Sequence, residues 1–141
     1  RDRLAGHLRA LKAVGIAHDP ELVIEGDWSA SAGYEATVRL LALKERPTAI
    51  FCQNDRMAIG CYEALKEAGL SIPEDISVIG YDDEEISRHL HPQLSTVILP
   101  HRQMGRWAVK ALGAGPAARP VTVTALACSL VSRASVSRPR P

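Results

Sequence analysis

The sequence lacks long apolar runs, an excess of charge of either sign, and a paired set of cysteines. No hydrophobic stretch approaches the roughly 20 residues of a membrane-spanning helix, so a membrane partner is not predicted. The net charge is +1 and the basic residues are scattered, which excludes nucleic-acid binding through bulk charge. With 141 residues, 46% of them hydrophobic, the chain matches one ordinary folded domain.

The cysteines are odd in number and lie inside apolar segments, at Cys52, Cys61 and Cys128. Neither a C-x-x-C pair nor a secretory signal accompanies them. This usage is typical of reduced, buried thiols, and it predicts a cytoplasmic protein.

Enzyme signatures are also absent. The sequence contains no G-x-G-x-x-G, no phosphate loop ending in Gly-Lys-Ser/Thr, no H-E-x-x-H and no G-x-S-x-G. His89 and His91 stand near Glu84 and Glu85, but their spacing matches no specific metal site, and a polar loop is the better interpretation. We therefore assign no catalytic residue, no metal ligand and no cofactor.

The chain begins without Met and within a helical pattern. Leu4, Leu8, Leu11 and Val14 recur at the spacing of one helix face. We expect a fragment that starts where a strand should precede this helix.

Strand and helix patterns then alternate with short connections, which predicts βαβ units and a parallel sheet, an α/β fold. From residue 94 onward the strict alternation of strand and helix ends. The expected strands are 21–26, 48–52, 76–80, 94–99, 121–124 and 126–131, and a further helix is expected at 101–112. Residues 113–120 are typical of a surface loop, and 133–141 of a flexible tail.

Polar side chains follow three of the expected strands. Trp28 follows the first, Asn54 the second and Asp82 the third, while Arg3 begins the first helix. The carboxyl ends of parallel strands lie along one edge of the sheet, where ligands bind in open α/β folds.

These four residues are expected to converge on a small polyhydroxylated or heterocyclic ligand, with a ring stacked on Trp28 and polar groups bonded to the others. Each also has a structural interpretation. Trp28 could be a helix staple, Arg3 a solvated charge, and Asn54 or Asp82 a helix cap.

Several segments together resemble the C-terminal part of regulators of the LacI/GalR family, and they cover nearly the whole chain in family order. They are Arg-Leu-Ala-Gly at 3–6, Gly-Asp-Trp-Ser-Ala at 26–30, Gly-Tyr at 33–34, Pro-Thr-Ala-Ile-Phe at 47–51, Asn-Asp-Arg-Met-Ala-Ile-Gly at 54–60, Pro-Glu-Asp-Ile-Ser-Val-Ile-Gly-Tyr-Asp-Asp at 73–83, Pro-Gln-Leu-Ser-Thr-Val at 92–97 and Leu-Val-Ser-Arg-Ala-Ser at 130–135. His91 and Ser95 depart from the commoner family residues, Pro and Thr.

The resemblance implies a two-lobed, periplasmic-binding-protein-like effector domain. Residues 1–98 would form most of the C-terminal lobe, 99–118 a crossover helix of the N-terminal lobe, and 119–132 the returning strands, with 133–141 as a flexible tail. The positions of Arg3, Trp28, Asn54 and Asp82 would face the effector, and that of His101 would lie at the cleft. Ile59 and Leu90 match dimer-interface positions of the family.

The implied function is the sensing of a small effector, a sugar or nucleoside, by a homodimeric transcriptional regulator. Operator DNA would be bound only through a headpiece that this sequence does not contain. A periplasmic sugar-binding protein for transport shares the fold, and an α/β enzyme is a third alternative. A helix-turn-helix or a signal peptide upstream of residue 1 would separate the first two.

Overall fold

The structure, a computed structural model, describes residues 2–113 and 123–139. In order along the chain, its helices, 3-10 helices and strands are α1 (Asp2–Ala13), η1 (Pro20–Leu22), α2 (Ala30–Leu41), β1 (Ala49–Phe51), α3 (Asp55–Glu67), β2 (Ser77–Ile79), η2 (Glu85–Arg88), β3 (Thr96–Ile98), α4 (His101–Gly113) and β4 (Ser129–Val131).

The strands β1 and β2 pair in parallel, with Ile50 opposite Val78. Single parallel bridges, Ile79 with Ser95 and Asp82 with Ile98, continue this arrangement toward β3, and β4 pairs antiparallel with β3. The predicted α/β class with a small parallel sheet is thus confirmed.

Side-chain caps fix where α2 and α3 begin, and these caps place the loops of the later site. The Ser29 hydroxyl accepts the Ala32 N–H at 3.0 Å. The Asn54 side-chain oxygen accepts the Met57 N–H at 2.7 Å. Each cap satisfies an N–H that a helix cannot pair internally.

The core lies between α2, α3 and the β1–β2 pair. The apolar spacing of α3 predicts an inward face at Ala58, Cys61, Leu65 and Ala68. The first three are fully buried, whereas Ala68, the C-cap residue, is exposed.

On α2 the spacing predicts Tyr34, Val38 and Leu41 as the buried face, but the buried residues are Gly33, Thr37 and Leu40, each one position earlier. The reason is the close crossing of the two helices, where Gly33 lies against the Met57 backbone and Gly60 against that of Ala30.

The strand expected at 21–26 does not form. Its first residues belong to η1, and Val23 is extended without a ladder. A strand exists only where a neighbouring strand takes its N–H and C=O groups, and no β-pairing among the described residues involves this segment. Of the strands expected at 121–124 and 126–131, only Ser129–Val131 is paired within the described range, and 121–122 lie outside it. Cys128 is exposed, contrary to expectation, while Cys52 and Cys61 are buried.

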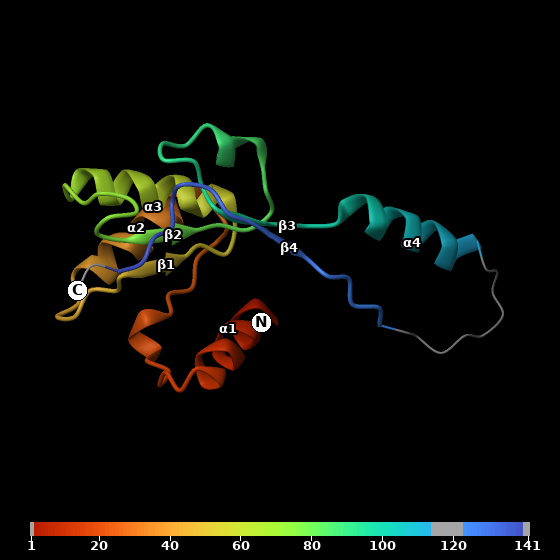
Figure 1. The fold of residues 1–141 in the computed structure, drawn as a ribbon, viewed down its shortest axis with the longest axis horizontal. Helices are drawn as coiled ribbons and strands as arrows, with labels where there is room; N and C mark the ends of the chain where they lie inside the picture. Colours follow the sequence, from red (N-terminus) through yellow and green to blue (C-terminus); the bar gives the residue numbers. More distant parts are fainter. Residues whose placement is uncertain (1, 114–122, 140–141) are drawn as a thin grey trace.

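The two outer helices, α1 and α4, contain no buried residue in the described structure. Figure 1 shows α4 projecting away from the sheet at the far end of β3 and β4, and α1 on the opposite side of β1 from α3. None of the helices in the described ranges is long and apolar enough to cross a membrane.

The segment after β4 is tied to the sheet, although a flexible tail was expected from Arg133 onward. The Ser135 carbonyl accepts the Val78 N–H at 2.8 Å, and the Ser135 hydroxyl, fully buried, donates to the Val78 carbonyl at 2.6 Å. Ser137 bonds Ser77 in turn. These contacts order residues 133–137 and fix the segment that carries Arg133.

Candidate functional site

The acidic turn after β2 has an unusual backbone. Asp82 and Asp83 have positive φ angles of 114° and 54°. Such angles are costly for residues other than glycine, on the order of 1–3 kcal/mol each, and persist only where the surroundings enforce them. Here the Asp82 N–H is held by the Val97 carbonyl at 2.9 Å. The turn thereby fixes the direction of the Asp82 carboxylate.

Arg3 reaches this turn from the first turn of α1. Its guanidinium lies 3.8 Å from an Asp82 carboxylate oxygen, 4.0 Å from the centre of the Tyr81 ring and 5.2 Å from that of Trp28. It also donates a hydrogen bond to the Gln53 carbonyl. Three separate loops therefore meet at one cation.

Trp28 and Asn54 form the other side of the site. The Asn54 amide N–H donates to the Trp28 carbonyl at 3.1 Å, while its oxygen caps α3. Asn54 is 6% exposed, and its side chain both caps α3 and holds the Trp28 backbone, whose φ angle is 73°. The Trp28 ring is 55% exposed, so a ligand can stack against it.

Burial raises the pKa of Asp82, and Arg3 and His101 oppose this effect while Glu84 adds to it. The Asp82 carboxylate is therefore partly withdrawn from water, and hydroxyl or N–H groups of a ligand could donate charge-assisted hydrogen bonds to it.

Asp55 supports the acidic turn from beneath. Its side chain is fully buried and accepts hydrogen bonds from the Thr96 hydroxyl at 2.6 Å and the Glu84 N–H at 2.8 Å. Its own N–H donates to the Tyr81 carbonyl at 2.9 Å. Burial raises the pKa of Asp55, although these hydrogen bonds partly offset the shift. Asp55 thus joins α3, the turn and β3.

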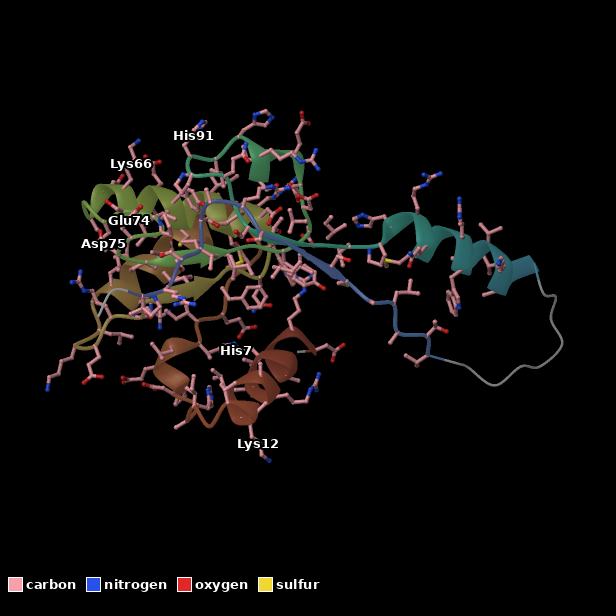
Figure 2. The ribbon with its side chains drawn as sticks, in the orientation of Figure 1. His7, Lys12, Lys66, Glu74, Asp75 and His91 are labelled. Carbon is pink, nitrogen blue, oxygen red and sulfur yellow. The ribbon has the colours of Figure 1, made fainter. Side chains whose placement is uncertain are left out.

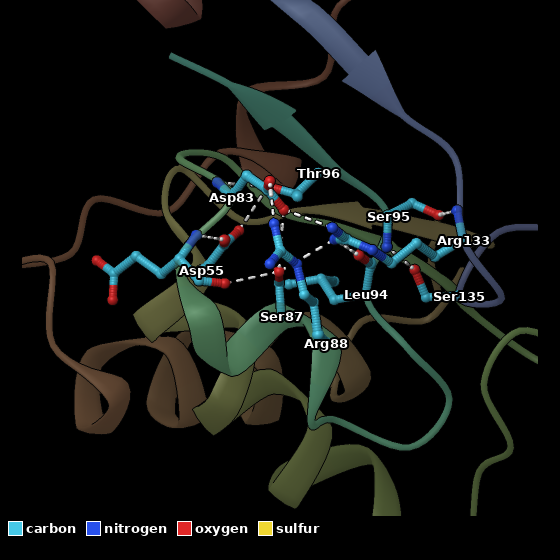
Figure 3. A network of polar contacts seen from close by, with 10 residues as sticks. Asp55, Asp83, Ser87, Arg88, Leu94, Ser95, Thr96, Arg133 and Ser135 are labelled. Carbon is cyan, nitrogen blue, oxygen red and sulfur yellow. Dashed lines mark hydrogen bonds and ion pairs between the residues drawn. The ribbon is translucent and has the colours of Figure 1, made fainter. Parts of the chain in front are cut away.

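Asp83 points into a different network from Asp82 (Figure 3). Its carboxylate lies 2.5 Å from the Arg133 guanidinium and 3.1 Å from that of Arg88, and it accepts the Ser87 hydroxyl at 3.2 Å. The side chains of Asp83 and Arg133 are only 8% and 11% exposed. Burial raises the pKa of Asp83, but Arg133, Arg88 and Ser87 together outweigh it and leave this pKa lowered.

The structure brings Arg3, Trp28 and Asp82 together and uses Asn54 as their support. Sequence reasoning missed Tyr81, the Gln53 carbonyl and the Asp83–Arg133 pair. Tyr81 was discoverable, because it stands beside Asp82 after the same strand. Nothing in the sequence pattern pairs Arg133 with a residue fifty positions earlier.

The residues expected at a dimer interface are both partly buried within the chain. Leu90 packs against the core cluster, whereas Ile59 lies on α3 outside it. No group of three or more His, Cys, Asp or Glu in the described part of the chain could hold a metal ion. His89 lies 3.9 Å from Glu85, and both side chains are largely exposed.

The sequence profile of the periplasmic binding protein-like domain matches residues 1–136. The chain belongs to this family. Within it, the similarity is to the effector-binding domain of LacI-type repressors, which are transcriptional regulators rather than enzymes.

Three relatives illustrate the match. The HTH-type transcriptional repressor PurR of Vibrio atlanticus (strain LGP32) is 42% identical over 111 residues, which are 79% of this chain and 33% of that protein. A sugar-binding LacI-family regulator from Escherichia coli, in complex with phosphate, superimposes with a TM-score of 0.87 at 33% identity, over 97% of this chain and 50% of the other.

A LacI-family regulator from Enterococcus faecium with bound ribose gives a TM-score of 0.82 at 33% identity, over 96% of this chain and 50% of the other. This chain therefore spans about a third of the curated relative's length and about half of each solved chain.

Proposed function

We propose that this chain senses a small polyhydroxylated effector, a sugar or a nucleoside, as part of a dimeric LacI-type transcriptional regulator. The observation that carries the proposal is the junction at Arg3, where an aromatic plane and a carboxylate from two other loops meet one guanidinium. Sugar recognition needs this combination of ring stacking and charge-assisted hydrogen bonds. The ribose bound to the Enterococcus faecium relative supports the same ligand class.

The proposed arrangement has two lobes. Residues 1–98 would form most of one lobe, 99–118 a crossover helix of the other, and 119–132 the return, of which 114–122 lie outside the described residues. The exposed faces of α4 support this division, because Trp107, Val109 and Leu112 are 42%, 71% and 84% exposed. A second lobe would cover them and complete the effector cleft near His101.

The proposed mechanism is a shift in population between lobe arrangements. An effector that binds one closure better favours that closure, in proportion to its difference in affinity for the two states. The changed geometry then reaches paired DNA-binding headpieces outside this sequence. A regulator of this kind works where its operator is, in the cytoplasm.

The test is titration calorimetry of the regulator that carries this chain, first against a panel of ribose, cellobiose, galactose, adenosine and cytidine. With a panel member that binds, Asp82→Ala should weaken binding at least tenfold, because ligand hydroxyls left without a partner cost roughly 1–3 kcal/mol. The matched control is Glu85→Gln, an exposed carboxyl at the start of η2, which should leave affinity unchanged.

Trp28 separates stacking from hydrogen bonding in the same titration. Trp28→Ala should weaken binding by a similar factor, whereas Trp28→Phe should cost much less because a flat apolar surface remains. Only Asp82→Ala should also reduce the difference in binding affinity between a sugar and its deoxy or epimeric analogue. Unchanged affinity in Asp82→Ala would show that the acidic turn is structural and would refute the proposal.

A further inference from the structure

Tyr81 lies at the junction around Arg3, and the proposed function gives it no role. It stands between β2 and Asp82, and the guanidinium carbon of Arg3 lies 4.0 Å from the centre of its ring, against 5.2 Å for the ring of Trp28. At 4.0 Å a planar guanidinium is in stacking contact with an aromatic face. The closer of these two aromatic contacts to the cation is therefore the one with Tyr81.

The other contacts of Arg3 do not fix the plane of its guanidinium. The Gln53 carbonyl accepts one of its N–H groups. An Asp82 carboxylate oxygen lies 3.8 Å away, which is within ion-pair range but longer than a hydrogen bond. A planar group held by one hydrogen bond at one edge can still rotate about that bond. The ring of Tyr81 prevents this rotation, because it lies against the face of the guanidinium.

The backbone of Tyr81 is held in place on both sides of the sheet edge. Its carbonyl accepts the Asp55 N–H at 2.9 Å, and the next N–H, that of Asp82, donates to the Val97 carbonyl at 2.9 Å. The side chain is half-buried and lies outside the core cluster of the described residues, which contains Tyr62. Core packing therefore does not explain where the ring lies, whereas its contact with Arg3 does.

The far end of the Tyr81 ring contacts a different part of the chain. Its hydroxyl donates to the Cys128 thiol at 3.8 Å, and that thiol donates to the Leu126 carbonyl at 3.9 Å. Figure 1 shows this segment, just before β4, coming back to the sheet from the side on which α4 projects. Burial and Cys128 raise the pKa of Tyr81, although Arg3 opposes them, so the phenol keeps its proton and remains a donor at neutral pH.

We propose that Tyr81 is a positioning residue of the effector site, which acts through Arg3 and links it to the segment before β4. Its ring sets the plane of the guanidinium and keeps one edge of it toward Asp82, while its hydroxyl joins the ring to Cys128. A movement of the returning segment then changes the orientation of the cation, and a ligand that fixes the cation restrains the segment in return. The part of this role that concerns a ligand rests on the proposed function, whereas the positioning of Arg3 does not.

The first test needs no ligand and uses the 141-residue chain. Nitrogen-15 relaxation of the Arg3 Nε–H group, measured by NMR, reports how tightly the guanidinium is held. Tyr81→Leu should lower the order parameter of this group by about a third, the difference between a rigid and a flexible group. Tyr81→Phe keeps the ring and should leave it within a tenth of the wild-type value.

Tyr34→Leu is the matched control for the loss of a tyrosine ring, because the Tyr34 hydroxyl donates to Glu67 in the α2–α3 pair. It should leave the relaxation of Arg3 unchanged, and circular dichroism confirms that each variant is folded. An Arg3 side chain that is as ordered in Tyr81→Leu as in the wild type would overturn the positioning role.

The link to the returning segment is tested on the same resonance with Cys128→Ala, which alters only an exposed thiol. The freed hydroxyl should let the Tyr81 ring move, and the order parameter of Arg3 should fall, though by less than in Tyr81→Leu. Ser129→Ala, at the exposed neighbouring position, is the control and should have no effect. An unchanged Arg3 in Cys128→Ala would refute the link.

The ligand arm is a double-mutant cycle by titration calorimetry on the regulator, with a member of the sugar and nucleoside panel that binds. Tyr81→Leu should weaken binding at least fivefold in the wild type but less than twofold in an Arg3→Gln background, because Tyr81 acts through Arg3. An equal loss in both backgrounds would show that Tyr81 contacts the ligand itself, and the positioning role would be wrong. Failure of every panel member to bind would count against the proposed function, while the relaxation of Arg3 would still decide the role of Tyr81.

Discussion

Asp82 and Asp83 are neighbours in sequence and have opposite surroundings. Asp82 faces Arg3 at a surface that remains accessible, while Asp83 is enclosed with Arg133. The positive φ angles of both residues turn the two carboxylates apart. One acid is thereby available to a ligand, and the other anchors the turn to the segment after β4.

Asp83→Asn should lower the free energy of unfolding by about 3 kcal/mol, because it leaves the nearly buried Arg133 guanidinium without its counter-charge. Chemical denaturation followed by circular dichroism measures this change. Arg88→Ala is the matched control, since Arg88 contacts the same carboxylate at 3.1 Å but its side chain is 59% exposed. It should cost less than about 1 kcal/mol. Equal losses in the two variants would contradict this ranking.

The difference in stability between the wild type and Asp83→Asn should depend on pH. The folded-state pKa of Asp83 is lowered, so its ionisation stabilises the fold above the unfolded pKa of about 3.9 and this contribution is lost as pH falls through the folded value. Asp55 and Asp82, whose pKa values are raised, act in the opposite direction. The wild type should therefore lose its advantage over Asp83→Asn as the pH falls below 4.

At the residue scale, the sequence could indicate the site because polar residues following parallel strands share an edge. Asn54 and Asp82 do follow the paired strands β1 and β2, whereas Trp28 and Arg3 follow no described strand and still lie beside them. Their role in binding an effector stays a prediction. Asn54 follows β1 as predicted, but its side-chain amide already bonds the Met57 N–H as a helix cap and the Trp28 carbonyl. Which way an amide points depends on backbone angles that no spacing rule contains.

At the element scale, α2 and α3 cross so closely that, at the contact, glycines of one helix lie directly against the backbone of the other. A Cβ on Gly60 would overlap the Ala30 carbonyl, and one on Gly33 would overlap the Met57 carbonyl. This crossing turns α2 so that Gly33, Thr37 and Leu40 face inward. Apolar periodicity predicts the face with the larger side chains, and so it missed this rotation, whereas for α3 it was wrong only at Ala68.

Gly60→Ala should therefore lower the free energy of unfolding by about 3 kcal/mol, since the added methyl group meets rigid backbone that cannot move aside. Gly105→Ala in α4 is the matched control, because a Cβ there meets nothing within 4 Å. It should gain about 0.5–1 kcal/mol from helix propensity. Thermal unfolding of both variants checks the pair, and a neutral Gly60→Ala would mean that the crossing is looser than described.

At the scale of the whole molecule, the fold class followed from the alternation of patterns, but the unpaired segment 23–25 and the exposed α4 did not. Both depend on what lies next to them in three dimensions. A strand pattern without a neighbour gives no strand, and an amphipathic helix without a covering surface gives no core. In the same way, a dimer interface at Ile59 and Leu90 would depend on a second copy of the chain lying against them.

We expect Ile59→Lys to convert a dimer of the regulator into monomers, because an isologous interface would place the two charges near its axis. Sedimentation equilibrium measures the mass. Leu90→Lys should act alike, with circular dichroism to confirm folding, since Leu90 also contacts the core. Lys12→Glu on the outward side of α1 is the control (Figure 2). A wild-type monomer at high concentration would contradict the expectation.

The 141-residue chain itself should show no sequence-specific affinity for DNA. The family match occupies residues 1–136 and leaves no room for a recognition helix, and a net charge of +1 offers few contacts to phosphates. Selection from a random duplex library followed by fluorescence anisotropy at 50 and 200 mM salt tests this. Any residual binding should be weak, should not enrich a motif, and should fall steeply with salt, because it would depend on counterion release alone. An enriched motif that is bound at 200 mM salt would place a DNA-reading surface within this domain.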